Sequence, residues 1–401
     1  MTLAHRIRLV PTADQEVYFR KACGVARFAY KWGLAEWRRC HAAGEKTNEA
    51  ALRKALNAIK REQFPWMLEV TKNAPQQAVK NLGRAYANFF EDLQKYKRKE
   101  IPWKRVRVPT FKKKGKSRDS FRADNWCDAK HPDAVAVDGK RVKLPVIGWV
   151  RMREEVRFAG KIVSVTISRE ADAWYASFVI EVEYEPEAHV HTNTVGVDLG
   201  SEALATRSDD TPKVPAPKPL RRYLKKTQRL SRAVSRKQRG SNNRAKVKTT
   251  LARLYARIRH IRQDALHTLT TDLARTAATI VIEDLNVAGM LANRHLSRAI
   301  ADLGFYEFRR QLEYKTAMAG GRLIVADRWF PSSKLCSVCG VKNETLELSE
   351  RTWTCLSCGT FHDRDRNAAR NLARYPESWA GSACGADGSD RRHQTTVNPA
   401  A

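Results

Sequence analysis

Two pairs of cysteines near the C-terminus constrain this chain more than any other feature of its sequence. Cys336 and Cys339 form one CxxC pair, Cys355 and Cys358 form a second, and fifteen residues lie between the pairs. A redox-active CxxC pair or a set of unrelated buried thiols is the alternative interpretation. Two CxxC pairs that are each followed by glycine are hard to obtain by chance, which argues against it. The pattern predicts a tetrahedral Zn²⁺ site, and because four thiolates leave no open position we expect the metal to be structural.

Three carboxylates are candidates for the chemistry. Asp198 lies near the end of the apolar segment "TVGVDLG", Glu283 ends "AATIVIE", and Asp365 lies in "HDRDRNAARN", seven residues after Cys358. A carboxylate that ends an apolar strand is costly unless it is paired or binds a metal. Each one alone is typical of a helix cap or an ion pair. Together they fit a site in which carboxylates hold two Mg²⁺ ions about 3.5–4 Å apart.

The sequence also contains competitors for this site. Asp284 follows Glu283 directly, and Asp363 lies two residues before Asp365. Alternation of apolar residues gives only a weak preference between neighbours, so the residues alone leave this choice open.

The charge of the chain points to a polyanionic partner. Its 401 residues include 74 Lys and Arg against 43 Asp and Glu, a formal net charge of +31. Such a surplus favours nucleic acid. Residues 221–262 contain sixteen Lys or Arg and no acidic residue, which predicts two basic helices broken at "RGSNN". A solvated helix face is the plain alternative, but we expect a surface that follows phosphates. Its leading residues are Arg221, Arg222, Lys225, Lys226, Arg229 and Arg232.

The order of patterns along the chain predicts several parts. Residues 5–10 alternate like a strand, "PTADQ" offers Thr12 and Gln15 as a capping box, and residues 13–97 have helical spacing. Short alternating segments over roughly 118–188 predict strands, so the helical region is expected to be an insertion into a β-barrel. Three apolar strands follow, two of them separated by an amphipathic helix, and this order predicts an α/β domain. The C-terminal residues are mostly small and polar, which predicts a disordered tail.

No segment reaches the roughly 18 apolar residues of a membrane span, and the N-terminus has no apolar signal-peptide core. The cysteines outside the two pairs are scattered, which suits a reducing compartment. We therefore expect no membrane partner and a cytoplasmic, nucleoid-associated protein. The scattered cysteines are Cys23, Cys40, Cys127 and Cys384.

The motifs together closely resemble those of the TnpB family, transposon-encoded RNA-guided nucleases related to the type V CRISPR effectors. The resemblance rests on "VGVDLG", "IEDLN", "LGFYEFRRQLEYKTAMAGGRLIVADRWFPSSKLCSVCG" and "RTWTCLSCGTFHDRDRNAARNL". It extends back through "GVARFAYKWGL", "QAVKNLGRAYANFF" and "PTFKKK", so it covers nearly all of the chain except the tail.

The resemblance implies a multidomain protein with a RuvC-like nuclease domain of the RNase H fold, interrupted by a zinc ribbon. Residues 1–12 and 118–190 would form a β-barrel wedge domain, and residues 13–117 a helical recognition domain. Residues 191–328 and 360–376 would form the nuclease domain, residues 329–359 the zinc ribbon, and residues 377–401 the tail. The family's catalytic carboxylates match Asp198, Glu283 and Asp365, and its contacts to a short adjacent DNA motif match Lys72 and Gln76.

The implied function is an Mg²⁺-dependent, RNA-guided DNA endonuclease in a prokaryotic cell. Its partners would be a guide RNA from the transposon end and double-stranded target DNA, in a monomeric ribonucleoprotein. The alternative is a guided repressor that binds DNA without cutting, but the complete set of carboxylates favours cleavage. A transposase proper would also use acidic residues on an RNase H fold, and the zinc ribbon before the last Asp argues for the guided family.

Overall fold

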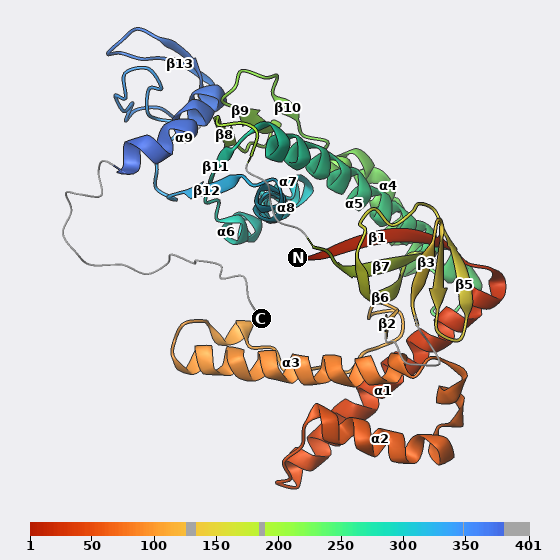
Figure 1. Cartoon of the computed structure of the whole chain (residues 1–401). Coiled ribbons are helices and arrows are strands. Elements are labelled where there is room, and N and C mark those ends of the chain that lie inside the picture. The colour runs from red at the N-terminus through yellow and green to blue at the C-terminus, as the bar shows by residue number, and fades with distance from the viewer. Residues whose placement is uncertain (126–133, 184–188, 348, 381–401) are drawn as a thin grey trace. The chain divides into compact units, whose positions relative to one another are not determined.

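A computed structural model describes residues 1–125, 134–183, 189–347 and 349–380 (Figure 1). The chain divides into two compact units, Met1–Tyr184 and Glu185–Ala401. The last helix, α9 (Arg364–Ala380), continues four residues into the segment expected to be a tail. Residues 381–401, with Cys384, lie outside the described residues, as does Cys127.

The first unit contains a seven-stranded antiparallel sheet. Its order is β2-β6-β7-β1-β5-β4-β3, so the N-terminal strand β1 lies in the middle and joins the later strands as expected. No pairing among the described residues connects β2 to β3, and the β-barrel remains a prediction. The strands are β1 (Thr2–Val10), β2 (Ser120–Asp124), β3 (Ala136–Asp138), β4 (Arg141–Leu144), β5 (Gly148–Met152), β6 (Lys161–Glu170) and β7 (Ala173–Glu181).

Helices occupy the chain between β1 and β2, as the spacing predicts. They are α1 (Ala13–Ala42), α2 (Glu49–Gln63) and α3 (Asn73–Lys97), with short 3₁₀ turns at Pro65–Glu69 and Trp103–Arg105. The predicted capping box is present, because Thr12 accepts from the backbone N–H of Gln15 and the Gln15 side chain accepts from that of Thr12. Phe19 of α1 packs on Trp174 and Phe121 of the sheet, so helices and strands share one core.

The second unit is built on a five-stranded sheet of order β10-β9-β8-β11-β12. The strands β8, β11 and β12 are parallel, and β9 returns antiparallel to β8. The strands are β8 (Thr194–Asp198), β9 (Ala203–Arg207), β10 (Val214–Pro215), β11 (Thr279–Glu283) and β12 (Arg322–Ala326). The remaining helices are α4 (Pro219–Arg236), α5 (Asn242–Thr276), α6 (Val287–Ala292), α7 (Ser297–Leu303) and α8 (Phe305–Met318).

Helices cover both faces of this sheet. Val195 and Val197 of β8 belong to the same core as Ile280 and Ile282 of β11, with buried residues of α5 and α8. Val281 packs on the other face, against Leu372 of α9. Since side chains alternate between the faces of a strand, the residues in step with Val281 point toward α9.

Gly196 allows α9 to lie directly on β8. A Cβ atom at this position would lie 2.0 Å from the carbonyl oxygen of Ala369 and 2.4 Å from the backbone nitrogen of Ala373. No side chain fits there, and only glycine permits this backbone approach.

The cysteine pairs lie in a small lobe that precedes α9. Its two-stranded sheet pairs β13 (Thr352–Thr354) with β14 (Phe361–Asp363). Cys336, Leu346, Trp353 and Cys355 form its buried core. Because β14 runs into α9 without a break, the lobe and this helix are one continuous piece of chain.

Replacing Gly196 with alanine should displace α9 and lower the free energy of unfolding by about 1–3 kcal/mol, the usual cost of overpacking. Gly24 in α1 is a matched control, because an added Cβ there meets nothing within 4 Å. Gly24→Ala should be neutral or stabilise by up to about 1 kcal/mol, since glycine is a poor helix former. Urea unfolding of both variants decides the matter, and equal midpoints would contradict the packing argument.

Candidate active site and zinc cluster

The three predicted carboxylates come from three elements that meet at one edge of the second sheet. The parallel register places Ile282 opposite Val197, so Asp198 and Glu283 each follow one residue later at the carboxyl ends of neighbouring strands. Asp198 is in step with Gly196, and Glu283 with Val281, so both belong to the face that α9 covers. Asp365 is the second residue of α9.

The electrostatics of Asp198 reflect this arrangement. Burial raises the pKa of Asp198 well above its usual value, and the nearby negative charges of Glu283 and Asp365 raise it further. Lys213 and Arg364 oppose the shift. Asp198 therefore interacts with both Glu283 and Asp365, as expected for acidic groups that share a site.

Lys213, just before β10, is a part of the site that the sequence did not reveal. Its ammonium nitrogen lies 2.9 Å from a carboxylate oxygen of Asp365 and 2.9 Å from one of Asp363. Arg351 lies further from Asp365, at 3.9 Å. An isolated lysine in "DDTPKVP" carries no signal of such a contact, which depends on how the β9–β10 connection folds back.

Asp363 and Asp365 differ in their surroundings. Asp363 precedes the first residue of α9 and accepts a hydrogen bond of 2.9 Å from the backbone N–H of Arg366, the geometry of a helix N-cap. Its side chain is 40% exposed, against 19% for Asp365. Asp363 thus has a structural role at the helix start, whereas Asp365 is one of the two acidic groups that raise the pKa of Asp198.

Asp284, the second competitor, is neutralised. Two guanidinium groups bind its carboxylate, that of Arg309 at 2.9 Å and that of Arg328 at 2.5 Å. Glu283 instead accepts a hydrogen bond of 2.5 Å from the hydroxyl of Ser332. In the part of the chain that the structure describes, no basic side chain forms an ion pair with Asp198 or Glu283.

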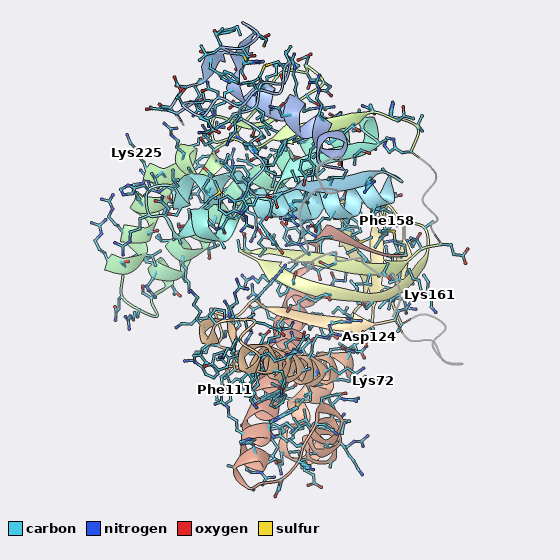
Figure 2. The ribbon with its side chains drawn as sticks, turned by 90° about the vertical axis from the view of Figure 1, so that its left-hand side faces the viewer. Lys72, Phe111, Asp124, Phe158, Lys161 and Lys225 are labelled. Atoms are coloured by element: carbon cyan, nitrogen blue, oxygen red, sulfur yellow. The ribbon has the colours of Figure 1, made fainter. Side chains whose placement is uncertain are left out.

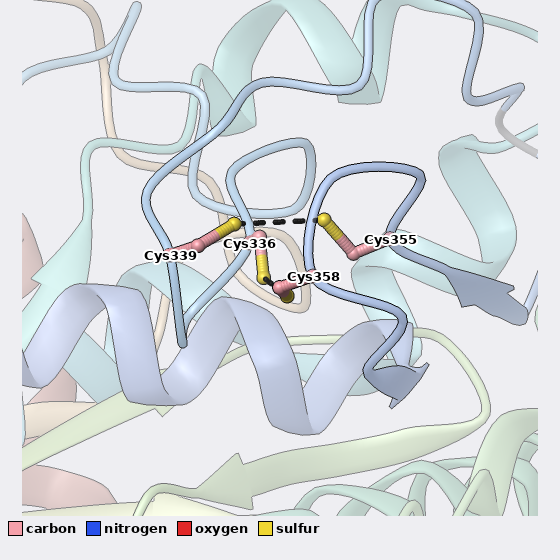
Figure 3. Close-up of side chains that lie close together, drawn as sticks. All are labelled: Cys336, Cys339, Cys355 and Cys358. Atoms are coloured by element: carbon pink, nitrogen blue, oxygen red, sulfur yellow. Dashed lines mark hydrogen bonds between the residues drawn. The ribbon is translucent and has the colours of Figure 1, made fainter.

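The four cysteines of the two pairs come together as predicted (Figure 3). Among the described residues they are the one group of three or more potential ligands whose ligand atoms all lie within 4.8 Å of one another. Sulfur atoms of Cys336 and Cys358 lie 3.6 Å apart, as do those of Cys339 and Cys355. A tetrahedron with Zn–S bonds of about 2.3 Å has edges of about 3.8 Å, so the cluster fits a structural Zn²⁺ ion.

Residues around the thiols support ligation. Hydrogen bonds from the side chain and backbone of Thr360 lower the pKa of the Cys358 thiol. A backbone hydrogen bond of Val341 lowers the pKa of the Cys339 thiol, but burial and the three other thiols outweigh it and raise this pKa, as expected for sulfur atoms crowded at one point. His362 is buried against Trp353, and its Nε2 lies 3.1 Å from the sulfur of Cys336. The cysteine spacing gave no indication of this histidine.

The helix that carries Asp365 also holds the first knuckle. The side chain of Asn367 accepts from the backbone N–H of Ser337 at 2.9 Å and donates to the carbonyl of Leu335 at 2.7 Å. Asn371 donates to the carbonyls of Ser332 and Leu335, both at 2.7 Å. Asn367 and Asn371 are 2% and 6% exposed, so these amides replace water for buried backbone groups.

The basic surface predicted over residues 221–262 is formed by α4 and α5, which pack on each other. Figure 2 labels Lys225 on α4. Asp302 of α7 accepts from the backbone N–H groups of Leu220 and Arg221 at 2.9 and 3.0 Å, which fixes the start of α4. All six residues singled out on α4 are exposed, namely Arg221, Arg222, Lys225, Lys226, Arg229 and Arg232.

Lys72 and Gln76 lie together at the start of α3, with Lys72 exposed at its N-cap (Figure 2). Both line one pocket between α2 and α3, and Arg53, Asn57 and Lys60 of α2 line it from the other side. The pair therefore faces a polar depression with basic walls.

Comparisons with known proteins agree with this description. Residues 177–294 match the sequence model of the family OrfB_IS605, described as "Probable transposase", and residues 305–372 match a "Cas12f1-like, TNB domain". Residues 1–46 match a model described as "Helix-turn-helix domain", although here they form β1 and the single long helix α1.

Two bacterial relatives share the length of the chain. A protein of Streptomyces pristinaespiralis named "Putative RNA-guided DNA endonuclease" is 37% identical over 95% of this chain and 90% of its own. A protein of Escherichia coli (strain K12) with the same description is 34% identical over 92% of this chain and 91% of its own. The chain belongs to the TnpB family.

A solved structure shows the same fold. The TnpB chain aligns with Cas12f1, solved by cryo-electron microscopy with an sgRNA and target DNA, at a TM-score of 0.54 and 13% identity. The alignment covers 93% of this chain and 98% of Cas12f1. No helix among the described residues of this TnpB is long and apolar enough to cross a membrane.

Replacing Cys355 with serine should remove most of the zinc from the purified chain, because Cys355 is 2% exposed and is both a thiol of the cluster and part of the core of the lobe. Zinc per chain is measured by mass spectrometry after dialysis against a weak chelator. Cys40→Ser is the control, because Cys40 is a buried free thiol of α1 outside the cluster, and this variant should keep its zinc. Full zinc content in Cys355→Ser would exclude the cluster as the site.

Proposed function

We propose that this TnpB is an RNA-guided DNA endonuclease that hydrolyses phosphodiester bonds of a target next to a short adjacent motif. The names of its full-length relatives support this, as does the complete set of strand-end carboxylates. The observation that carries the proposal is the meeting of Asp198, Glu283 and Asp365 on the α9 face of the sheet, two of them without a basic partner among the described residues. The protein would act on DNA inside a prokaryotic cell.

Two Mg²⁺ ions are the proposed catalytic cofactors. Bound there, they would activate water and stabilise the leaving oxygen of the phosphodiester. Carboxylates that bind two different metal ions can lie further apart than thiolates that share one ion. The three carboxylates therefore need not be as closely spaced as the four sulfur atoms of the thiol cluster. Asp198, Glu283 and Asp365 would supply the oxygens, Ser332 would orient Glu283, and Lys213 would hold Asp365.

The finer domain assignment is part of the proposal. The five-stranded sheet with its parallel strands and flanking helices supports a RuvC-like nuclease domain of the RNase H fold, interrupted by a zinc ribbon. The seven-stranded sheet would act as the wedge domain, in the form of a β-barrel, and the helices between β1 and β2 as the recognition domain.

The partners would be a guide RNA derived from the transposon end and a double-stranded DNA target, in a monomeric ribonucleoprotein. Base pairing with the guide would read most of the target sequence, while Lys72 and Gln76 would contact the adjacent motif. The exposed cations of α4 would follow a phosphate backbone. Sequencing the RNA that copurifies with the chain gives the guide needed to test the proposal.

Substituting Asp198, Glu283 or Asp365 with alanine should lower guided cleavage by at least about 100-fold, because even an outer-shell partner of a metal ligand typically contributes 10–100-fold. Guided binding should persist, since these groups act on the transition state more than on docking. Single-turnover cleavage and gel-shift affinity are measured on a duplex matched to the copurified guide.

Asp363→Ala is the matched control for these variants. It removes a helix cap worth about 1 kcal/mol and one contact of Lys213, so cleavage should fall less than in Asp365→Ala. An inactive Asp363 variant beside an active Asp365 variant would reverse the assignment. If the wild-type complex bound the target without cutting it, the protein would be a guided repressor. Joining of transposon ends without RNA would make it a transposase.

Neutralising Arg221, Lys225 and Arg229 together should weaken nucleic-acid binding equally for all sequences. The slope of log affinity against log salt should become shallower by about 0.9 or less per lost phosphate contact. Base specificity should survive, because phosphate contacts carry no sequence information. Affinities over a salt series test this, and an unchanged slope would show that α4 does not contact the backbone.

A further inference from the structure

Trp329 is the least protected tryptophan of the described chain, with 84% of its surface exposed. Neither the thiol cluster nor the three carboxylates explain why this tryptophan is exposed. Exposing a large indole to water is unfavourable, and tryptophan, with its large apolar ring and its one N–H donor, is enriched at binding interfaces. The position of Trp329 decides which ligand it suits.

Trp329 lies in the loop after β12, and the residues at both ends of this loop are neighbours of Glu283. Ala326, the last residue of β12, is the register partner of Glu283, and Ser332 donates its hydroxyl hydrogen bond to the Glu283 carboxylate. Trp329 is three residues from each of them, so its Cα lies within about 11 Å of both. The loop that carries Trp329 therefore borders the candidate active site at Glu283.

The backbone around Trp329 is held firmly. The backbone N–H of Asp327 donates to the hydroxyl of Tyr375 at 3.1 Å, and the Asp327 carboxylate accepts from the backbone N–H of Trp329 at 2.8 Å. Phe330 packs edge-on against the ring of Tyr375, at 5.0 Å between centroids. Asp327 and Phe330, on either side of Trp329, are thus both anchored on Tyr375 of α9, while the indole itself is exposed to solvent. The backbone therefore holds the side chain in a preorganised position.

We propose that Trp329 is a stacking platform for an unpaired base of the DNA strand that enters the carboxylate cluster. This rests on the proposed function and assigns a positioning residue to the same site. Every base has a π-face, so an aromatic platform holds a strand without reading its sequence, as a guided enzyme with variable targets requires. The adjacent Arg328 is held by its ion pair with Asp284, which further fixes the backbone of the loop.

Stacking should fix the scissile phosphate relative to Asp198, Glu283 and Asp365, so Trp329 affects the cleavage rate more than the affinity for the guided duplex. Because the side chain is exposed, replacing it removes little packing and the variants should fold. Trp329→Phe keeps a π-face, whereas Trp329→Leu keeps apolar bulk without one. This pair separates stacking from simple apolar contact.

The test has a binding arm and a cleavage arm. In the first, the full chain binds single-stranded oligodeoxythymidine that carries 5-iododeoxyuridine, and the crosslinked peptide is mapped after irradiation. The wild type and the phenylalanine variant should crosslink at position 329, and the leucine variant should not. This arm needs neither guide nor cleavage, so a crosslink at Trp329 without guided cutting would overturn the proposed function and leave the platform standing.

In the second arm, single-turnover cleavage of a guide-matched duplex should fall about ten-fold in Trp329→Leu, with duplex affinity changed less than two-fold, and Trp329→Phe should recover most of the rate. Iodouridine at single positions of the target should crosslink to Trp329 only near the cut. A leucine variant that cuts at the wild-type rate would overturn the inference. So would a crosslink of Trp329 to guide RNA in place of DNA, or the absence of any nucleic-acid crosslink.

Discussion

The close packing of α9 on β8 is the contact on which the second unit depends. Gly196 lets the backbone of α9 approach the strand, and two residues later the same strand face presents Asp198. A larger residue would push the helix away and with it Asp365, which lies in its first turn. The relative position of Asp198 and Asp365 therefore depends on the absence of a side chain at position 196, because a single Cβ atom there would collide with the backbone of α9.

The same helix explains why a cysteine lobe precedes "DRDRN" so closely. One side of α9 rests on the sheet, and Asn367 and Asn371 hold the backbone of the first knuckle. The thiol cluster gives that knuckle a fixed shape, so it fixes the start of α9 both through the chain and through these amides. A zinc ion bound by the cluster would thereby be coupled to Asp365, and we propose that the lobe positions this third carboxylate in addition to any contact of its own with nucleic acid.

Much of this arrangement could be predicted from local patterns. The capping box at Thr12, the three strands that lead to or follow the site, the two basic helices and the cysteine cluster all depend on residues close in sequence. Lys213, His362 and Ser332 could not be found in this way, because each acts through a partner 26 to 152 residues away. The β-barrel expected for the first unit stays a prediction, since alternation predicts strands and not which edges pair, and no pairing among the described residues connects β2 to β3.

The distribution of charge in the second unit separates binding from chemistry. The six cations singled out on α4 are exposed, and residues 221–262 contain no acidic residue. Near the site, by contrast, Arg309 and Arg328 form ion pairs with Asp284, and Lys213 forms ion pairs with Asp363 and Asp365. Asp198 and Glu283 are left as partly buried carboxylates in a chain of net charge +31. Such groups are stable only if protonated or neutralised by a cation, and divalent ions meet that need while leaving positive charge for a phosphate.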